Sequence, residues 1–139
     1  MDLSLSDEQK QLQEGVERFV RDKYAFENRK KIAASERGWL PENWAQFAEL
    51  GWLAIPFSED DGGIGFGAIG TMIVMEQFGK GLVLEPLLPT VVLGGGLIAA
   101  AGSKAQKEAL LAPMIEGKKQ FAFAWLERQS RYNLADGAL

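Results

Sequence analysis

The chain has 139 residues, of which 47% are hydrophobic and 24% are charged, and it carries a net charge of −4. This composition is typical of one soluble globular domain, and the scattered basic residues argue against a nucleic-acid surface. The sequence contains no cysteine and no histidine, which excludes disulfides and zinc–sulfur sites and removes the commonest general base and metal ligand.

The N-terminal segment predicts a helix rather than a targeting signal. The first ten residues lack the basic and apolar regions of a signal peptide, so we expect a cytoplasmic protein. Ser6 and Gln9 have the spacing of a capping box. Apolar residues then recur at the spacing of an amphipathic helix, at Leu12, Val16, Phe19 and Val20. A second, more polar helix is expected over residues 24–35.

A short helix, a loop and a fourth helix are expected next. Pro41 occupies a typical first helical position, and Gly51 is a typical stop. Residues 55–67 contain one proline, three carboxylates and four glycines, which indicates a loop. Apolar residues at helical spacing then predict a helix over residues 68–78.

The loop contains two motifs that could bind ligands. Residues 65–70 match the dinucleotide fingerprint G-x-G-x-x-G, but that motif requires a preceding strand and a surrounding βαβ unit. The acidic residues 59–61 make a poor strand, so a glycine-rich loop is favoured over an NAD site. The acidic triplet lacks the ligand spacing of a calcium loop and is expected to be a solvated turn. We therefore predict no metal site.

An uncharged segment covers residues 86–103. A membrane span is one interpretation, but the segment is short for a span and lacks basic or aromatic anchors. It also contains two prolines and four glycines. A buried helix over residues 89–101, ending at Gly102, is therefore expected instead.

A last helix and a strand are expected after this segment. Ser103 and Gln106 form a second potential capping box, and Pro113 should bend or restart the helix that follows before Gly117 ends it.

Residues 120–126 alternate between bulky residues and alanines, which predicts a strand with Phe121, Phe123 and Trp125 on one face. These aromatic side chains could stack on a ligand, but their periodicity favours a role in the core. A lone strand cannot satisfy its own backbone groups. Either another chain pairs with it or the native protein continues past Leu139.

Several short motifs occur in order along the chain. They are LSDEQ at 5–9, ELGWLAIP at 49–56, EDDGGIG at 59–65, MEQFG at 75–79, AGSKAQK at 101–107 and LAPMIEG at 111–117. In this order and at these separations they resemble the acyl-CoA dehydrogenase family over nearly the whole chain. The resemblance implies an all-α bundle of about six helices over residues 1–118. Residues 119–139 would then begin the middle β domain.

The resemblance also implies a function. Members of this family are FAD-dependent enzymes that introduce an α,β double bond into acyl-CoA thioesters, working as homo- or hetero-oligomers. FAD lies between the middle and C-terminal domains, and the C-terminal domain supplies the carboxylate base. No residue of this chain is therefore expected to be catalytic, and the chain alone is expected to be inactive. The N-terminal domain contributes to the acyl pocket, for which the candidates here are Leu88, Val92 and Leu93.

The predicted strand falls on the family's flavin-contacting motif, which makes Phe123, Trp125 and Leu126 the candidate FAD contacts. Leu126 stands where the motif has a threonine whose hydroxyl bonds the flavin, and Arg128 stands where it has a proline. The run ERQSRY at 127–132 resembles small-subunit members such as the pimeloyl-CoA dehydrogenase small subunit, which pair with a different dehydrogenase subunit. The alternative is a non-catalytic helical module that docks on such a partner. No nucleic-acid or membrane partner is expected.

Overall fold

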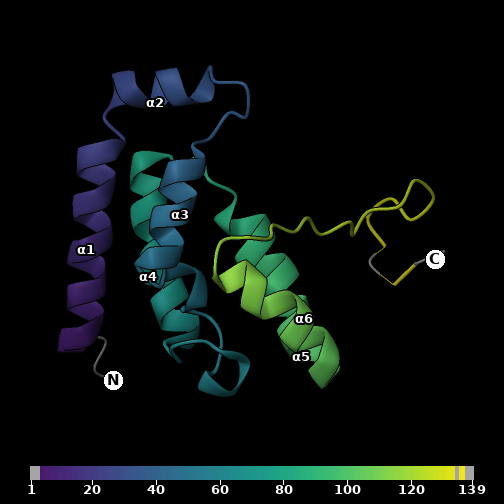
Figure 1. Ribbon diagram of the computed structural model, residues 1–139. Helices are drawn as coiled ribbons and strands as arrows, with labels where there is room; N and C mark the ends of the chain where they lie inside the picture. Colours follow the sequence, from purple (N-terminus) through teal and green to yellow (C-terminus); the bar gives the residue numbers. More distant parts are fainter. Residues whose placement is uncertain (1–3, 134, 137–139) are drawn as a thin grey trace.

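The computed structural model describes residues 4–133 and 135–136. In this part of the chain all regular structure is helical, which confirms the expected all-α bundle (Figure 1). The α-helices are α1 (Asp7–Lys23), α2 (Phe26–Ala33), α3 (Pro41–Glu49), α4 (Gly67–Gly81), α5 (Gly96–Ala101) and α6 (Lys104–Ile115). Two short 3₁₀ helices, η1 (Trp52–Ala54) and η2 (Glu59–Asp61), lie in the loop region, and a π-helix, η3 (Leu88–Gly95), precedes α5.

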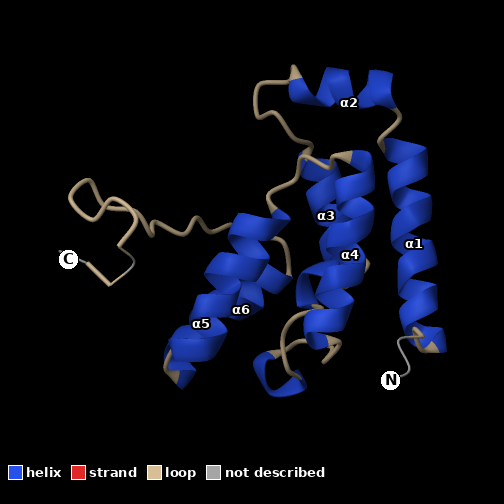
Figure 2. Cartoon of the chain, turned by 180° about the vertical axis from the view of Figure 1, so that it is seen from behind, coloured by secondary structure: helices blue, strands red, loops and turns tan. Residues whose placement is uncertain are grey.

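The helices form two groups. Figures 1 and 2 show α1, α3 and α4 side by side, with α2 lying crosswise at one end of them. The continuous helix made of η3 and α5 pairs with α6 in the second group. The chain after α6 first crosses η3, and its last described part, yellow in Figure 1, extends away from both groups.

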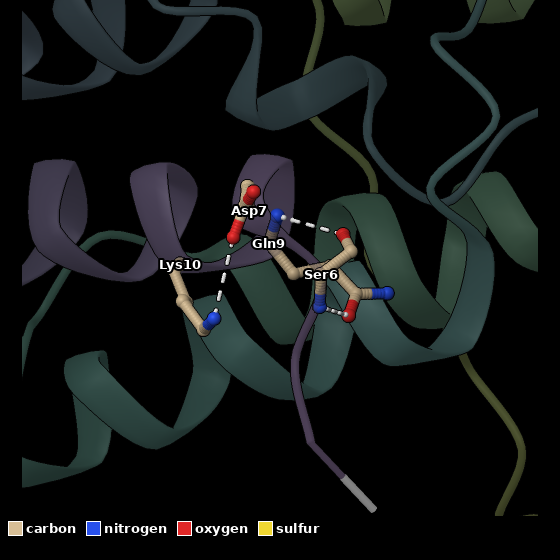
Figure 3. Close-up of polar contacts among 4 residues, drawn as sticks. All are labelled: Ser6, Asp7, Gln9 and Lys10. Atoms are coloured by element: carbon tan, nitrogen blue, oxygen red, sulfur yellow. Dashed lines mark hydrogen bonds and ion pairs between the residues drawn. The ribbon is translucent and has the colours of Figure 1, made fainter.

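Both predicted capping boxes are present. At the start of α1 the Gln9 N–H donates to the Ser6 hydroxyl at 3.2 Å, and the Ser6 N–H donates to the Gln9 side-chain oxygen at 2.9 Å (Figure 3). Ser103 and Gln106 make the same pair of bonds at the start of α6. Each box satisfies two backbone N–H donors at a helix start, and both helices begin where the capping boxes predicted.

An aromatic cluster joins α1, α3, η1 and α4. The rings of Phe19, Phe47, Trp52 and Phe78 contact one another at centroid separations of 4.9 to 5.9 Å. Phe47 is fully buried at the centre. Phe19 belongs to the apolar face predicted for the first helix, and the four rings together close the core of the first group.

The acidic loop differs from its expected form as a solvated turn. Glu59 and Asp60 are exposed, but Asp61 makes a partly buried ion pair with Lys107 of α6 at 3.2 Å. The Ser58 hydroxyl also donates to Asp61 at 3.2 Å. The prediction was therefore wrong for Asp61, because a basic residue 46 positions away reaches it across the fold. The described residues contain no group of ligands that could hold a metal ion.

The glycine motif at residues 65–70 lies in a loop and the first turn of α4. No strand precedes it within the described residues, so the condition for a dinucleotide site is not met. Gly65 and Gly67 have positive φ angles of 71° and 59°, which a residue with a side chain rarely adopts.

The helix expected over residues 89–101 is present in altered form. It begins as the π-helix η3, continues as α5 and ends at Ala101, directly before Gly102. The expectation that this helix is buried holds for one face only. Gly95 lies against Phe57 and Met114, whereas no described element covers the opposite face. None of the helices in the described residues is long and apolar enough to cross a membrane.

Pro113 does not restart α6, which continues through it to Ile115. The proline removes the bond that its own N–H would have donated to the preceding turn, but bonds beside it, such as that from the Glu116 N–H to the Ala112 carbonyl at 3.0 Å, keep the end of the helix closed. Gly117 follows the helix with φ 74° and ends it as expected.

Residues 120–126 do not form a strand, which corrects the expected secondary structure of this segment. The physical reason is that a single strand cannot satisfy its own backbone groups. A strand requires a neighbouring strand for its backbone groups, whereas the described neighbour of Phe121 is the Thr90 side chain of the helix η3.

Candidate functional site

The three residues expected to line an acyl pocket share one face of η3. Leu88 and Leu93 are 47% and 40% exposed, and Val92 between them is partly buried. Leu97 of α5 continues the row at 50% exposure. Their separations of four and five residues suit the wider turn of a π-helix, whose hydrogen bonds run from residue i to i+5. We call Leu88, Val92, Leu93 and Leu97 the apolar strip.

The opposite face of η3 holds the start of the C-terminal segment. Thr90 is fully buried, and its hydroxyl donates to the Phe121 carbonyl at 3.1 Å. The same hydroxyl accepts from the Phe121 N–H at 3.4 Å. Gly94 lies against Phe121 so closely that a Cβ atom there would be 2.6 Å from the Phe121 Cβ. Thr90 and Gly94 therefore anchor residue 121, a role that the sequence analysis missed. The signal available in the sequence was the one hydroxyl, that of Thr90, within the helix predicted over residues 89–101.

The candidate flavin contacts lie beyond this anchor. Phe123, Trp125 and Leu126 are 40%, 48% and 50% exposed, and the segment that carries them extends away from the helices (Figure 1). Among these three side chains, the only hydrogen-bond donor is the Trp125 indole N–H. By themselves these residues do not fit FAD, because they form no enclosure and offer no hydroxyl at position 126. The candidate flavin contacts and the apolar strip are therefore not joined in one cavity.

A buried polar cluster lies between the two helical groups, and the sequence analysis did not identify it. The Glu85 carboxylate is 5% exposed and accepts from the Tyr24 hydroxyl, the Asn43 amide at 2.9 Å and the Leu40 N–H at 3.3 Å. Burial, together with the hydrogen bond and the negative charge of Glu85, raises the pKa of Tyr24 well above its ordinary value of 10.0.

This cluster connects four parts of the chain. Tyr24 ends α1, Leu40 precedes α3, Asn43 lies in α3, and Glu85 lies three residues before η3. With three donors directed at its carboxylate, Glu85 is enclosed and not open to a substrate. The arrangement is suited to fixing the position of η3 and its apolar strip, not to proton transfer. The only signal in the sequence was a glutamate at the edge of an uncharged run.

A separate groove of about 730 Å³ lies between α1, the end of α3 and the glycine-rich loop. Its lining is apolar at the floor and carries both positive and negative residues at the rim. This mixture selects no one kind of ligand, and none of the candidate site residues lines the groove. The lining includes Leu12, Phe19, Trp52, Ile55 and Phe66, with Glu8, Arg18, Asp22 and Lys23 around them.

Comparisons with known proteins bear on this geometry. The family described as "Acyl-CoA dehydrogenase, N-terminal domain" matches residues 6–118. The short-chain-specific acyl-CoA dehydrogenase of Clostridium acetobutylicum is 30% identical over 132 residues, which are 91% of this chain and 34% of that protein. The mitochondrial isovaleryl-CoA dehydrogenase of Bos taurus is 31% identical over 125 residues, which are 88% of this chain and 29% of that protein.

A solved structure shows the same arrangement of helices. The structure of butyryl-CoA dehydrogenase from Megasphaera elsdenii has a TM-score of 0.79 and 27% sequence identity, and the match covers 97% of this chain and 36% of that chain. The chain therefore spans about a third of the length of the relatives it matches.

Proposed function

The chain belongs to the acyl-CoA dehydrogenase family, and we propose that it acts as the N-terminal domain of an FAD-dependent acyl-CoA dehydrogenase. The proposed reaction is α,β-dehydrogenation of an acyl-CoA thioester. The family match over residues 6–118 supports this proposal. We also propose that the helical domain covers residues 1–118 and that residues 119–139 begin the middle β domain. Because the chain spans about a third of its relatives, the flavin site and the catalytic base come from elsewhere in the working assembly.

The apolar strip is the observation that carries the proposal. It consists of half-exposed aliphatic side chains on a helix whose other face is packed. Complete burial of a leucine side chain contributes about 1.5–3 kcal/mol, so covering the strip would be strongly favourable. A covering domain that left room beside the strip would create an elongated apolar cavity, which is the shape that an acyl chain fits. The polar CoA portion would remain outside it.

The proposal assigns no catalytic step to this chain. Glu85 is buried but occupied by three donors, and the sequence has no histidine. We propose that the purified chain does not oxidise acyl-CoA and that Phe123, Trp125 and Leu126 contact FAD only once another polypeptide segment encloses them. The departures at Leu126 and Arg128 support a small-subunit type of chain, working in the cytoplasm with a second, different dehydrogenase subunit.

The test uses the assembly isolated through an affinity tag on this chain in its native host. We expect the assembly to contain flavin and to reduce an artificial electron acceptor when an acyl-CoA is added. Leu93→Asp should raise KM for acyl-CoA about tenfold or more, because it introduces a charge into an apolar site. Leu50→Asp is the matched control, because Leu50 is also 50% exposed but lies at the end of α3, outside the strip. Equal KM values in the two variants would contradict the assignment.

A second candidate function is a non-catalytic module that docks on a partner dehydrogenase. The unpaired aromatic segment at residues 120–126 favours it, since exposed aromatic side chains on a free backbone edge are typical of a surface that another chain covers. A colourless assembly that reduces no acceptor would establish this alternative.

A further inference from the structure

Thr90 uses its hydroxyl differently from Thr71, the other threonine of the chain. In α4 the Thr71 hydroxyl donates to the Gly67 carbonyl one turn back at 2.8 Å, which is a common local bond of a threonine inside a helix. The Thr90 hydroxyl instead donates to the Phe121 carbonyl at 3.1 Å and accepts from the Phe121 N–H at 3.4 Å. Because Thr90 is fully buried, these bonds tie η3 to a residue 31 positions away.

Gly94 brings the same two segments into close contact. It lies one turn after Thr90 in η3, and a Cβ atom at this position would be only 2.6 Å from the Phe121 Cβ. Glycine inside a helix is destabilising relative to alanine, so the chain keeps this close approach against the preference of the helix. The hydroxyl and the missing side chain therefore act together to hold Phe121 at one position along η3.

The two faces of η3 carry different parts of the proposed site. The half-exposed side chains of the apolar strip lie on one face, and Thr90 and Gly94 hold Phe121 on the other. The π-helical form of η3 is one that occurs frequently at functional sites. Because both faces belong to one helix, the contact with Phe121 sets where the apolar strip lies relative to the segment that continues from that residue.

We propose that Thr90 is a positioning residue of the acyl site, which fixes where a bound acyl chain lies along the apolar strip relative to residues 123–126, the candidate flavin contacts. This inference rests on the proposed function, because it takes the strip as the acyl-binding surface. Thr90 does not line the strip, so its loss should leave the binding of the acyl chain nearly unchanged. Its loss should slow the reaction of the bound chain, because a misplacement of about 1 Å costs up to about 100-fold in rate.

The first test compares threonine variants in the assembly isolated through a tag on this chain. In the Thr90→Val variant the maximal rate of flavin reduction by acyl-CoA should fall roughly tenfold, while the acyl-CoA concentration that gives half of this rate should change less than about twofold. Thr90→Ser keeps the hydroxyl and should retain most of the rate. Thr71→Val is the matched control, because it removes a hydroxyl bond within α4 and should leave both values unchanged.

A second variant and a second measurement do not depend on removing the hydroxyl or on the rate. Gly94→Ala keeps Thr90 but displaces Phe121 from η3, so it should slow flavin reduction as well, whereas Gly79→Ala meets no atom within 4 Å and should not. Hydrogen exchange of the assembly, followed by mass spectrometry, should be faster at residues 120–126 in the Thr90→Val and Gly94→Ala variants than in the two controls.

The outcomes separate this inference from the proposed function. If acyl-CoA reduces the flavin of the unmodified assembly, equal maximal rates in the Thr90→Val and Thr71→Val variants would overturn the positioning role and leave the proposed function standing. A Thr90→Ser variant as slow as Thr90→Val, or hydrogen exchange at residues 120–126 that neither Thr90→Val nor Gly94→Ala changes, would also overturn it. An unmodified assembly whose flavin no acyl-CoA reduces would overturn both.

Discussion

Removing the Tyr24 hydroxyl tests whether the buried polar cluster holds the two helical groups together. In the Tyr24→Phe variant the Glu85 carboxylate loses one of its three donors while remaining 5% exposed. A hydrogen bond to a charged group contributes about 1.5–3 kcal/mol. We therefore expect the free energy of unfolding at neutral pH to fall by about 2 kcal/mol. Tyr132→Phe removes the only other tyrosine, which is 91% exposed, and should change stability by less than about 0.5 kcal/mol.

The same cluster predicts a loss of stability at high pH. Folding raises the pKa of Tyr24 above its ordinary value of 10.0, so the unfolded chain loses this proton first as pH rises. The stabilising contribution is therefore complete below about pH 10 and is lost as pH rises from there toward the folded-state pKa. Burial is the largest cause of the raised pKa of Tyr24, so in the Glu85→Gln variant that pKa should still lie above its ordinary value.

Urea unfolding monitored by circular dichroism between pH 7 and 11 measures both effects. In the Tyr132→Phe variant, Tyr24 is the only tyrosine, so tyrosinate absorbance should appear only as the protein unfolds. Equal stabilities of the Tyr24→Phe and Tyr132→Phe variants at pH 7, or tyrosinate formation in the folded Tyr132→Phe protein near pH 10, would refute the account of this cluster.

Two further changes test the packing. Gly81→Ala should destabilise the chain by about 1–3 kcal/mol, because the new Cβ would collide with Val20 of α1. Gly79→Ala in the same helix meets no atom within 4 Å and should stabilise the chain by about 0.5–1 kcal/mol. Thermal unfolding of both variants measures the difference, and equal shifts in the unfolding temperature would contradict the close approach of α4 to α1. Thr90→Val keeps the shape of the side chain but removes both hydrogen bonds to Phe121. Residues 120–126 should then be cleaved faster in limited proteolysis, while α6 stays protected. An unchanged cleavage rate would show that Thr90 does not anchor this segment.

Local signals explain why much of the fold could be predicted from the sequence. Ser6 and Ser103 each begin a helix with a glutamine three positions later, so the interaction that sets the helix start is complete within one turn. Pro41 and Gly51 act in the same local way, through a fixed or a positive φ angle. Such features do not depend on the rest of the molecule, and the structure confirms each of them.

The features that escaped prediction depend on distant partners. Glu85 is enclosed by residues 42 to 61 positions away, and Asp61 finds its lysine 46 positions away. Gly94 and Gly95 of η3 lie against Phe121, Phe57 and Met114, contacts that no local pattern in the sequence records. The alternating pattern at residues 120–126 predicts a strand, but pairing is a property of two segments, and the described residues contain no second strand beside it. The candidate site likewise depends on surfaces that this chain leaves open.

Anaerobic addition of an acyl-CoA to the assembly isolated through this chain tests the central claim most directly. If the chain acts as the N-terminal domain of an acyl-CoA dehydrogenase, the flavin absorbance of the assembly should bleach as the cofactor is reduced. The Leu93→Asp variant should require a higher concentration of acyl-CoA to reach half-maximal bleaching than the Leu50→Asp control. An assembly without flavin, or a flavin that acyl-CoA of any chain length leaves oxidised, would contradict the account.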